Sequence, residues 1–327
     1  MRIAINGMGR IGRLLFRRLM EDKEFEVAAV NDVMPADNLA YLLKYDSIHG
    51  THEDEIKADK GIIHFNKKNI TAFQKEDPLH LPWKDLSIDV VLECSGKFSD
   101  KDSASKHLQA GAKRVLLSTT GAEDIPLRVY GYNQNESTAD LDILSPGGCM
   151  TNCSIHVLYI LNSIGIQSAH INILHSYTSR QSLVDGPHKQ FRRGRAAAES
   201  IIPVEIDLYK SLNRLMPSLQ DKINTISTRV PVANGALANF TVQLKDNISS
   251  AQVNKLFKTA AQNEYKGILD YTEDPLVSLD IKGNTHSCII DGTQTSSIGN
   301  HVRVAAWFDN EYGFTSRMID WLKYWKK

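Results

Sequence analysis

The stretch Ile5-Asn6-Gly7-Met8-Gly9-Arg10-Ile11-Gly12 decides how the first half of this chain folds. It joins a short β-type run, Ile3–Asn6, to a helical run, Arg10–Leu19. Its three glycines let the backbone turn tightly and approach a ligand, and the amide groups at the helix N-terminus can hold a pyrophosphate. A glycine-rich turn without this strand–turn–helix context would be a mere packing turn. In this context it predicts a dinucleotide-binding unit.

A carboxylate stands at the offset that such a unit requires. Asp32 follows a second β-type run, Glu26–Val30, and lies 20 positions after the last glycine of the motif. An acidic residue there accepts hydrogen bonds from the adenosine ribose and repels a 2′-phosphate, which predicts NAD rather than NADP as the cofactor. We therefore take Asp32, Gly9, Arg10 and Ile11 as candidate cofactor-binding residues, with Arg10 adding positive charge to the first helical turn.

Beyond this motif, the first half alternates short β-type runs with helical stretches. Asp89–Glu93 and Val115–Ser118 are β-type and are separated by the helix-compatible Lys101–Ala110. A β-rich excursion covers Glu53–Phe73. Strand–helix alternation at this pitch predicts an α/β fold in which helices cover both faces of a doubly wound parallel sheet.

The second half has longer β-type runs with few helices between them. This pattern predicts a catalytic α+β domain with a mixed, largely antiparallel sheet. The runs are Ile171–His175, Lys222–Val230, Ala238–Leu244 and Val302–Phe308, and a helical stretch covers Gln252–Glu264.

A breaker cluster, Ser145-Pro146-Gly147-Gly148, predicts the boundary between the two halves. Apolar residues at helical spacing within Arg317–Trp325 indicate a terminal packing helix. We therefore expect an NAD-binding domain over residues 1–147, a catalytic domain over 148–309, and a C-terminal helix over 310–327 that packs back on the first domain.

The composition is that of a soluble globular protein. Of the 327 residues, 42% are hydrophobic and 23% charged, and 38 basic residues balance 38 acidic ones. A neutral chain has no overall field to attract nucleic acid or an anionic membrane, so we expect neither as a partner. No apolar run reaches the ~20 residues of a membrane span, and no signal peptide fits before the first strand. Four cysteines are too few for a disulfide framework, so a cytoplasmic location is expected.

Cys149 is the candidate nucleophile. It stands between the breaker cluster and an apolar run with helical periodicity, Ile155–Leu161, and is predicted to begin a helix. The partial positive charge there lowers a thiol pKa and favours the thiolate. An inert buried thiol is the alternative for any single cysteine. Zinc is another alternative because Cys149, Cys153 and His156 share a helix face, but a fourth ligand is missing, and we expect no metal.

His175 is the candidate base. It ends the β-type run Ile171–His175 and opens a polar loop that reaches Arg180. Catalytic groups often lie on loops that leave strand ends. A histidine that is only hydrogen-bonded at a strand end shows the same pattern, so the residues alone leave both interpretations open.

Six motifs occur along the chain in an order that is specific to one family. They are Ile5–Arg13, Tyr45-Asp46-Ser47-Ile48-His49-Gly50, Cys149–Cys153, Val184-Asp185-Gly186-Pro187, Arg229-Val230-Pro231 and Trp307-Phe308-Asp309-Asn310-Glu311-Tyr312-Gly313. With them the chain resembles, over essentially its whole length, the phosphorylating glyceraldehyde-3-phosphate dehydrogenases and the related erythrose-4-phosphate dehydrogenases.

The resemblance implies roles for individual residues. It implies Cys149 as the nucleophile, His175 as the base that deprotonates it, and Asn310 as the residue that fixes the nicotinamide carboxamide. The further implied positions are Ser95, Gly96 and Ser118 along the cofactor path, and Thr178, Arg229, Thr151, Arg180, Gly148 and Met150 for substrate and phosphate.

The implied reaction is NAD-dependent oxidation of a phosphorylated sugar aldehyde, first of all glyceraldehyde 3-phosphate, through a thioester on Cys149 and acyl transfer to phosphate, as in glycolysis. The resemblance also implies a homotetramer in which the loop His188–Arg195 reaches a neighbouring subunit's cofactor. The alternatives are an erythrose-4-phosphate dehydrogenase, a hydrolytic aldehyde dehydrogenase, and a non-catalytic NAD-binding regulator. The nucleophile–base pair argues against the regulator.

The chain departs from the family around the site for inorganic phosphate. Gly148 and Met150 stand where the family has Ser and Thr, and Ile206-Asp207 replaces a Thr-Gly pair. Each lost donor weakens oxyanion binding by about 1.5–3 kcal/mol, and Asp207 adds a like charge. Arg180 can compensate with a fork of donors. We hypothesise weak or absent phosphorolysis, with water or another acceptor taking the acyl group.

Overall fold

The computed structural model describes residues 1–136 and 141–326, and the chain divides into two compact units. Unit 1 comprises Met1–Gly148 and Arg317–Lys327, and unit 2 comprises Cys149–Ser316. Residues 137–140 and Lys327, which belong to the predicted first domain and terminal helix, lie outside the described residues.

Within the described residues, unit 1 contains an eight-stranded sheet in the order β3-β4-β5-β2-β1-β6-β7-β8. All neighbours from β5 to β8 run parallel, while β3, β4 and β5 form an antiparallel edge. The strands are β1 (Arg2–Asn6), β2 (Glu26–Asn31), β3 (Ile56–Asp59), β4 (Ile62–Phe65), β5 (Lys68–Phe73), β6 (Val90–Glu93), β7 (Arg114–Leu117) and β8 (Ile143–Leu144). The predicted doubly wound sheet is confirmed, and the predicted β excursion supplies the antiparallel edge.

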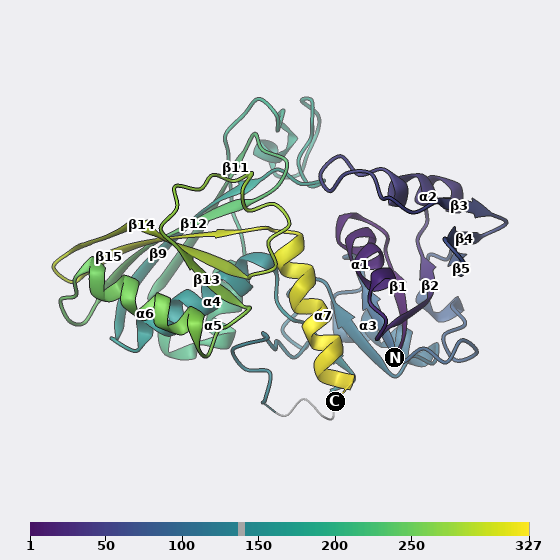
Figure 1. Cartoon of the computed structure of the whole chain (residues 1–327), viewed down its shortest axis with the longest axis horizontal. Coiled ribbons are helices and arrows are strands. Elements are labelled where there is room, and N and C mark those ends of the chain that lie inside the picture. Colours follow the sequence, from purple (N-terminus) through teal and green to yellow (C-terminus); the bar gives the residue numbers. More distant parts are fainter. Residues whose placement is uncertain (137–140, 327) are drawn as a thin grey trace. The chain divides into compact units, whose positions relative to one another are not determined.

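The strand order reverses between β1 and β6, because the chain first builds outward through β2 and then returns to the other side of β1. Such switch points are where open α/β sheets bind ligands, at the carboxyl ends of the strands. The helical elements of unit 1 are α1 (Arg10–Glu21), α2 (Ala36–Lys44), α3 (Lys101–Gln109) and the 3-10 turn η1 (Pro78–His80). Figure 1 shows α1 beside β1 and β2, and apolar side chains from Ala4, Ala29 and Trp83 join one core cluster of this unit.

Unit 2 contains a seven-stranded sheet in the order β10-β11-β9-β12-β15-β14-β13. Four of its neighbouring pairs are antiparallel and two are parallel, which confirms the predicted mixed, largely antiparallel sheet. The strands are β9 (Ile166–Ser176), β10 (Ile202–Val204), β11 (Ile223–Val230), β12 (Ala236–Leu244), β13 (Leu269–Thr272), β14 (Cys288–Ile298) and β15 (His301–Phe308).

Buried and more exposed side chains alternate along β9 and β12, as they do in a sheet covered on one face. Figure 1 shows the helices of unit 2 along one face of the sheet. They are α4 (Cys149–Asn162), α5 (Leu208–Leu215) and α6 (Ser250–Gln262), with 3-10 turns η2 (Phe191–Gly194) and η3 (Pro217–Leu219) in the connections. The apolar run after Cys149 is buried in α4, including Ile155, Val157 and Leu158.

The last helix, α7 (Tyr312–Lys326), starts in unit 2 and ends in unit 1. Its unit 1 portion buries Met318, Trp321 and Leu322 completely. The Trp321 ring lies edge-on to the Tyr130 ring, with centroids 6.2 Å apart. In the described parts of the chain, no helix combines the length and apolarity of a membrane span.

Candidate active site

A thiol and an imidazole face each other in unit 2. Cys149 is the first residue of α4, and His175 lies near the end of β9, with its Nε2 atom 3.8 Å from the Cys149 Sγ atom. His175 Nδ1 lies 2.7 Å from the carbonyl oxygen of Ser176. A carbonyl only accepts, so Nδ1 carries the hydrogen and the Nε2 lone pair faces the thiol. The strand thus presents His175 in the tautomer that can take a proton from Cys149.

The surroundings of both groups favour their neutral forms. Burial raises the pKa of the Cys149 thiol to about 11, against the opposing effects of the Arg229 guanidinium and the amide groups of Met150 and Cys149. Burial, helped by Arg229, lowers the pKa of His175 to about 3. The prediction that the helix start gives Cys149 a lowered pKa is therefore wrong in its net sign. The amide groups do favour the thiolate, but the loss of water around a buried thiol outweighs them.

Arg229 lies beside this pair because of strand register. On β11 it is the parallel neighbour of His175 on β9, and its Nη1 donates to the Ser176 carbonyl at 3.2 Å. Its side chain is buried, and burial lowers its pKa to about 10 although Cys149 opposes that shift. Its Nε atom has no hydrogen-bond partner among the described residues. A buried donor without a partner is costly, so this position suits an incoming acceptor.

Asn310 is fixed by a set of donors around its side-chain oxygen. Its Oδ1 accepts from the Gly235 amide at 2.9 Å and from the Ser176 hydroxyl at 3.2 Å. Asp309 holds the turn in place, because its Oδ1 accepts from the amides of Glu311 and Tyr312, both at 2.8 Å. Ser176 thus connects Asn310 to His175, since its carbonyl oxygen accepts from the imidazole.

The loop that follows β9 contains the other predicted substrate residues. The Thr178 amide and hydroxyl both donate to Gln181 Oε1, at 2.9 and 3.1 Å, so the hydroxyl hydrogen of Thr178 is already used. Arg180 is exposed. Arg193 is buried and adjoins this loop, where the Ser182 amide donates to its carbonyl at 3.0 Å. Arg193 Nη1 and Gln181 Nε2 are buried and have no partner among the described residues.

The residues around Cys149 where the chain departs from the family are placed as follows. Gly147, two residues before the start of α4, adopts φ +80°, a conformation that favours glycine. Gly148 has open space, because a β-carbon there would meet only the Thr120 hydroxyl, at 3.8 Å. Met150 is half-buried, and Thr151 is buried within α4. Neither Gly148 nor Met150 contributes a side-chain donor, as the sequence predicts.

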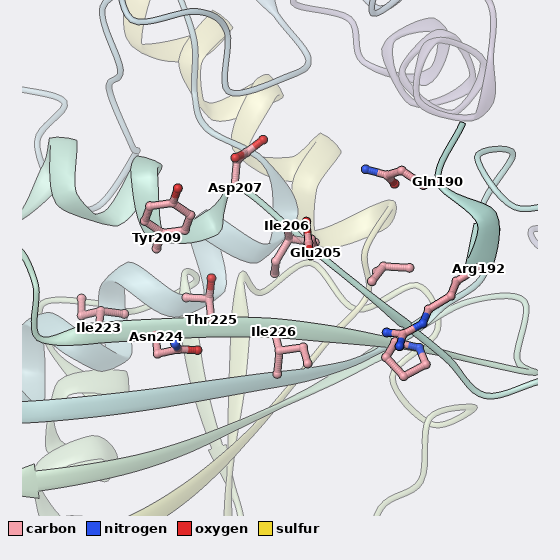
Figure 2. A pocket seen from close by; sticks show the side chains of 12 residues that line it. Gln190, Arg192, Glu205, Ile206, Asp207, Tyr209, Ile223, Asn224, Thr225 and Ile226 are labelled. Carbon is pink, nitrogen blue, oxygen red and sulfur yellow. The ribbon is translucent and has the colours of Figure 1, made fainter. Parts of the chain in front are cut away.

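Ile206 and Asp207 line a pocket of about 600 Å³ on unit 2, shown in Figure 2. Gln190 and Arg192 lie on one side of it, and Tyr209 lies on the other. Lys210 Nζ lies 2.8 Å from Asp207 Oδ1, so the charge of this carboxylate is partly offset. Cys149 and His175 are not among the residues that line the pocket.

The three residues of the zinc alternative have other partners. The Cys153 thiol interacts with Cys288, and burial raises its pKa well above the ordinary value. The His156 ring packs edge-on to Tyr265, with centroids 5.1 Å apart. Within residues 1–136 and 141–326, no group of three or more potential ligands is arranged to hold a metal ion.

Unit 1 contains the glycine-rich turn between β1 and α1 that was predicted to bind a dinucleotide. A β-carbon at Gly7, which has φ +92°, would come within 2.3 Å of the Ser95 amide nitrogen, and one at Gly12 within 2.0 Å of the Gly7 carbonyl. Gly9 differs, because a β-carbon there meets nothing within 4 Å. No side chain caps α1 at Gly9, so its first turn presents amide groups outward. The space at Gly9 therefore fits a pyrophosphate approaching the helix N-terminus.

Two charged residues at the predicted dinucleotide site, Asp32 and Arg10, have hydrogen-bond or ion-pair partners in the protein. Asp32 follows β2 and accepts from the Met8 amide at 2.5 Å and the Met34 amide at 3.0 Å. Arg10 Nη1 pairs with Asp46 Oδ2 at 2.6 Å. Although burial alone would raise it, hydrogen bonds from the His49 amide and from Arg10 lower the pKa of Asp46 to about 2. The charge that Arg10 was expected to add to the first turn is thus balanced by a carboxylate, while Ile11 is half-buried in α1.

The loops after β6 and β7 supply the remaining cofactor candidates. Ser95 and Gly96 are exposed directly after β6, and Ser118 follows β7, with its amide donating to the Glu93 carbonyl at 2.9 Å. Sequence reasoning missed the residues that orient these groups. They are Glu93 and Asp46 in unit 1 and Ser176, Gln181, Arg193 and Asp309 in unit 2. Ser176 carried a signal as the neighbour of His175, and Asp46 and Asp309 carried one as members of the quoted family motifs. Arg193 lies in the predicted loop His188–Arg195 but was not singled out.

Comparisons with known proteins find one enzyme family in both parts of the chain. A sequence model described as the NAD binding domain of glyceraldehyde 3-phosphate dehydrogenase matches residues 1–101, and one described as the C-terminal domain of the same enzyme matches residues 148–310. The chain is 40% identical over 326 residues to glyceraldehyde-3-phosphate dehydrogenase 2 of Bacillus subtilis (strain 168), covering 99% of this chain and 96% of the relative. It is also 40% identical over 326 residues to glyceraldehyde-3-phosphate dehydrogenase 1 of Bacillus cereus, covering 99% and 98%.

Proposed function

Because the chain belongs to the glyceraldehyde-3-phosphate dehydrogenase family, we propose that it oxidises glyceraldehyde 3-phosphate with NAD and passes the acyl group to inorganic phosphate. The observation that carries the proposal is the 3.8 Å approach of the Cys149 thiol to the unprotonated nitrogen of His175. The enzyme is an NAD-dependent oxidoreductase, and unit 1 provides the NAD-binding fold.

The first chemical role of His175 is to make Cys149 nucleophilic. Ionising either group alone leaves an unpaired buried charge, as the raised thiol pKa and the lowered imidazole pKa both indicate. Moving the proton from Sγ to Nε2 instead creates two opposite charges side by side, each compensating the other. The thiolate then adds to the aldehyde carbon, forming a C–S bond and a hemithioacetal.

The second role of His175 is to accept the proton of the hemithioacetal hydroxyl as the adduct is oxidised to the thioester. NAD, when bound, supplies the hydride acceptor for this oxidation. The Cys149 amide at the start of α4 is placed to stabilise negative charge on the substrate oxygen. Asn310, which the family pattern assigns to the nicotinamide carboxamide, keeps that role in the proposal.

Unit 2 contains hydrogen-bond donors that can bind the anionic groups of the substrate and of the acyl acceptor. Arg229 Nε, Arg193 Nη1 and Gln181 Nε2 are buried donors without partners among the described residues. An unpaired buried donor costs about 1–3 kcal/mol, which an incoming phosphate oxygen recovers. Arg229 and Thr178 are the proposed contacts of the substrate phosphate, with the Thr178 hydroxyl turning its hydrogen from Gln181 Oε1 to the phosphate. Arg180 adds positive charge at the edge of this region.

The alternatives predicted from the sequence are not favoured. Relatives that match over nearly the whole chain are named glyceraldehyde-3-phosphate dehydrogenases, which does not favour erythrose 4-phosphate as the substrate, a hydrolytic reaction or a non-catalytic regulator. The absence of side-chain donors at Gly148 and Met150 then affects the affinity for inorganic phosphate rather than the identity of the acceptor.

NADH formation from glyceraldehyde 3-phosphate tests the proposal. We expect turnover that depends on inorganic phosphate, and we expect Cys149→Ser to abolish it because the serine hydroxyl stays protonated at neutral pH and is a poorer nucleophile than a thiolate. Cys153→Ser, the same substitution four residues later on α4 at a thiol that interacts with Cys288, serves as the matched control. Equal rates with and without phosphate would contradict acyl transfer to phosphate, and turnover by Cys149→Ser would contradict the thioester.

The proposal extends to a cytoplasmic homotetramer. Several apolar side chains of the segment 183–201 are exposed to solvent. Phe191 is 89% exposed, Val184 78% and Ile201 71%. Exposed apolar patches of this kind usually meet another protein surface, and the family pattern gives the loop His188–Arg195 to a neighbouring subunit. Light scattering after gel filtration is expected to give four times the chain mass of 36.6 kDa. A monomer mass would contradict this part.

A further inference from the structure

A buried chain of polar side chains crosses the carboxyl ends of neighbouring strands in unit 1. We name it the Glu93 chain after its central residue. It consists of Trp83, His107, Glu93, Asn6, Asn31 and Ser95.

The links of the Glu93 chain are hydrogen bonds of 2.5 to 3.0 Å. Glu93 Oε2 accepts from Asn6 Nδ2 at 2.5 Å and from His107 Nε2 at 3.0 Å. Glu93 Oε1 accepts from the Ser95 amide at 2.7 Å and from the Ser95 hydroxyl at 2.5 Å. Asn31 Nδ2 donates to Asn6 Oδ1 at 2.7 Å, which continues the chain from β1 to β2.

The charge of Glu93 is held by neutral donors alone. Trp83 Nε1 can only donate, and it lies 3.0 Å from His107 Nδ1. His107 Nδ1 is therefore an acceptor, and the ring hydrogen sits on Nε2, facing Glu93. His107 in this tautomer is uncharged. Glu93 and His107 are 2% and 0% exposed, so the carboxylate depends on these donors because water cannot replace them.

Three members of the Glu93 chain lie in or next to the loops that were predicted to bind NAD. Asn6 ends β1 and precedes Gly7, Asn31 ends β2 and precedes Asp32, and Ser95 follows β6. These three strands are neighbours, in the order β2-β1-β6, at the point where the strand order reverses. Only Ser95 in this set is exposed, so it is the place where the buried chain reaches the surface.

We propose that Glu93 is a positioning residue for NAD, because its carboxylate holds the glycine-rich turn after β1 and the Ser95-Gly96 loop after β6 in one fixed arrangement before the cofactor binds. The proposal rests on the NAD-dependent function given above. Preorganised contacts strengthen binding because the loops lose no further freedom when the ligand arrives.

Glu93→Gln tests the charge and the direction of the hydrogen bonds with little change of shape. The new amide can still accept from Ser95 at one atom, but its NH2 group meets the donors of Asn6 and His107. We expect the Kd for NAD, measured by isothermal titration calorimetry, to rise ~10-fold, since a wrongly oriented buried donor disturbs the loops. At saturating NAD, kcat and the KM for the aldehyde are expected to stay within about twofold, because the thiol–imidazole pair is in unit 2.

Ser95→Ala removes one donor to Glu93, at the exposed end of the Glu93 chain, and leaves its buried members in place. We expect a smaller rise in the Kd for NAD, ~3-fold, and no further rise when it is combined with Glu93→Gln, since both act through the same carboxylate. Hydrogen exchange of the apo-protein is expected to be faster at the Ser95 and Gly96 amides in Glu93→Gln.

Val115→Ala is the control for general destabilisation. Val115 on β7 is fully buried in another cluster of unit 1, so its truncation lowers the Tm without touching the Glu93 chain. Its Kd for NAD is expected to match the wild type. An unchanged Kd in folded Glu93→Gln, an equal Kd increase in Val115→Ala, or additive effects in the double variant would overturn the proposal. A wild-type protein that does not bind NAD would instead overturn the proposed function.

Discussion

At the scale of single residues, the chemistry depends on how His175 is held. Its position on β9 and the Ser176 carbonyl fix the tautomer that faces Cys149. Burial raises the pKa of the Cys149 thiol and so disfavours the thiolate. A nearby imidazole that accepts the proton allows the thiolate to form beside an opposite charge. Reactivity of Cys149 near neutral pH is therefore a property of the pair and not of the helix start.

His175→Asn separates these two contributions. Without an acceptor for its proton, Cys149 must ionise alone against the burial that raises its pKa, so its thiolate fraction rises about tenfold per pH unit below that pKa. We expect alkylation by iodoacetamide at pH 7 to be ~100-fold slower than in the wild type, with a steep increase as the pH rises. The matched control is His170→Asn on the same strand, which should alkylate at the wild-type rate. A His175→Asn variant as reactive as the wild type at pH 7 would refute the role of the pair.

At the scale of elements, the start of α1 distinguishes a glycine needed by the fold from one needed by the ligand. Gly7 has positive φ and no room for a β-carbon, whereas Gly9 has φ −71° and open space. Both belong to the same motif, and the sequence pattern treats them alike.

Alanine at these two positions should therefore give opposite results. We expect Gly7→Ala to lower the free energy of unfolding by several kcal/mol, because a β-carbon collides with the Ser95 backbone. Gly9→Ala should fold with nearly wild-type stability but bind NAD ~10-fold or more weakly, because the methyl group occupies the space kept for the pyrophosphate. Urea unfolding and calorimetric NAD titration measure the two effects. Tight NAD binding by folded Gly9→Ala would contradict this assignment.

The sequence predicted the elements with strong periodicity and missed those whose pattern is short or interrupted. The strands β1, β2, β11 and β15 were expected within one residue of where they lie, while only the second half of β9 was expected. The helix α2 was missed, because its buried face consists only of Leu39, Ala40 and Leu43. The strand β14 was also missed, because its second half is exposed and polar from Thr293 to Ser297.

The candidate site was predictable where chemistry follows a local motif, as at Cys149, Asp32 and the glycines. It was not predictable where a residue acts through register or a distant partner. Arg10 pairs with Asp46, 36 positions away, and Glu93 meets Asn6 across 87 positions. The pKa of Cys149 was predicted with the wrong sign because burial depends on the whole of unit 2, which no local pattern contains.

At the scale of the whole molecule, the chain's last residues complete its first unit. Trp321 on α7 is fully buried and its ring contacts Tyr130, although the two are far apart in sequence. Lys326 Nζ also lies 2.9 Å from Glu24 Oε2. Unit 1 therefore needs both ends of the chain before its core is closed, while unit 2 is continuous in sequence.

Trp321→Ala is expected to destabilise unit 1 by about 3–5 kcal/mol, since a large buried ring is lost. Because NAD binds folded unit 1, saturating NAD should recover part of the lost Tm in differential scanning calorimetry. Tyr159→Ala, which removes a ring that is 52% exposed on α4, is the control and should leave the transition unchanged. An unaltered Tm for Trp321→Ala would show that α7 does not support unit 1.

The two hydrogen bonds of Asp32 also limit how this protein could evolve. Its carboxylate is both the group that disfavours a 2′-phosphate and the acceptor that ties down the Met8 and Met34 amides. A substitution that removes the negative charge to admit NADP also releases the glycine-rich turn. A change of cofactor therefore requires at least two coordinated substitutions, one for charge and one to hold the turn again. A lineage changing one residue at a time would first pass through an enzyme that binds both cofactors poorly.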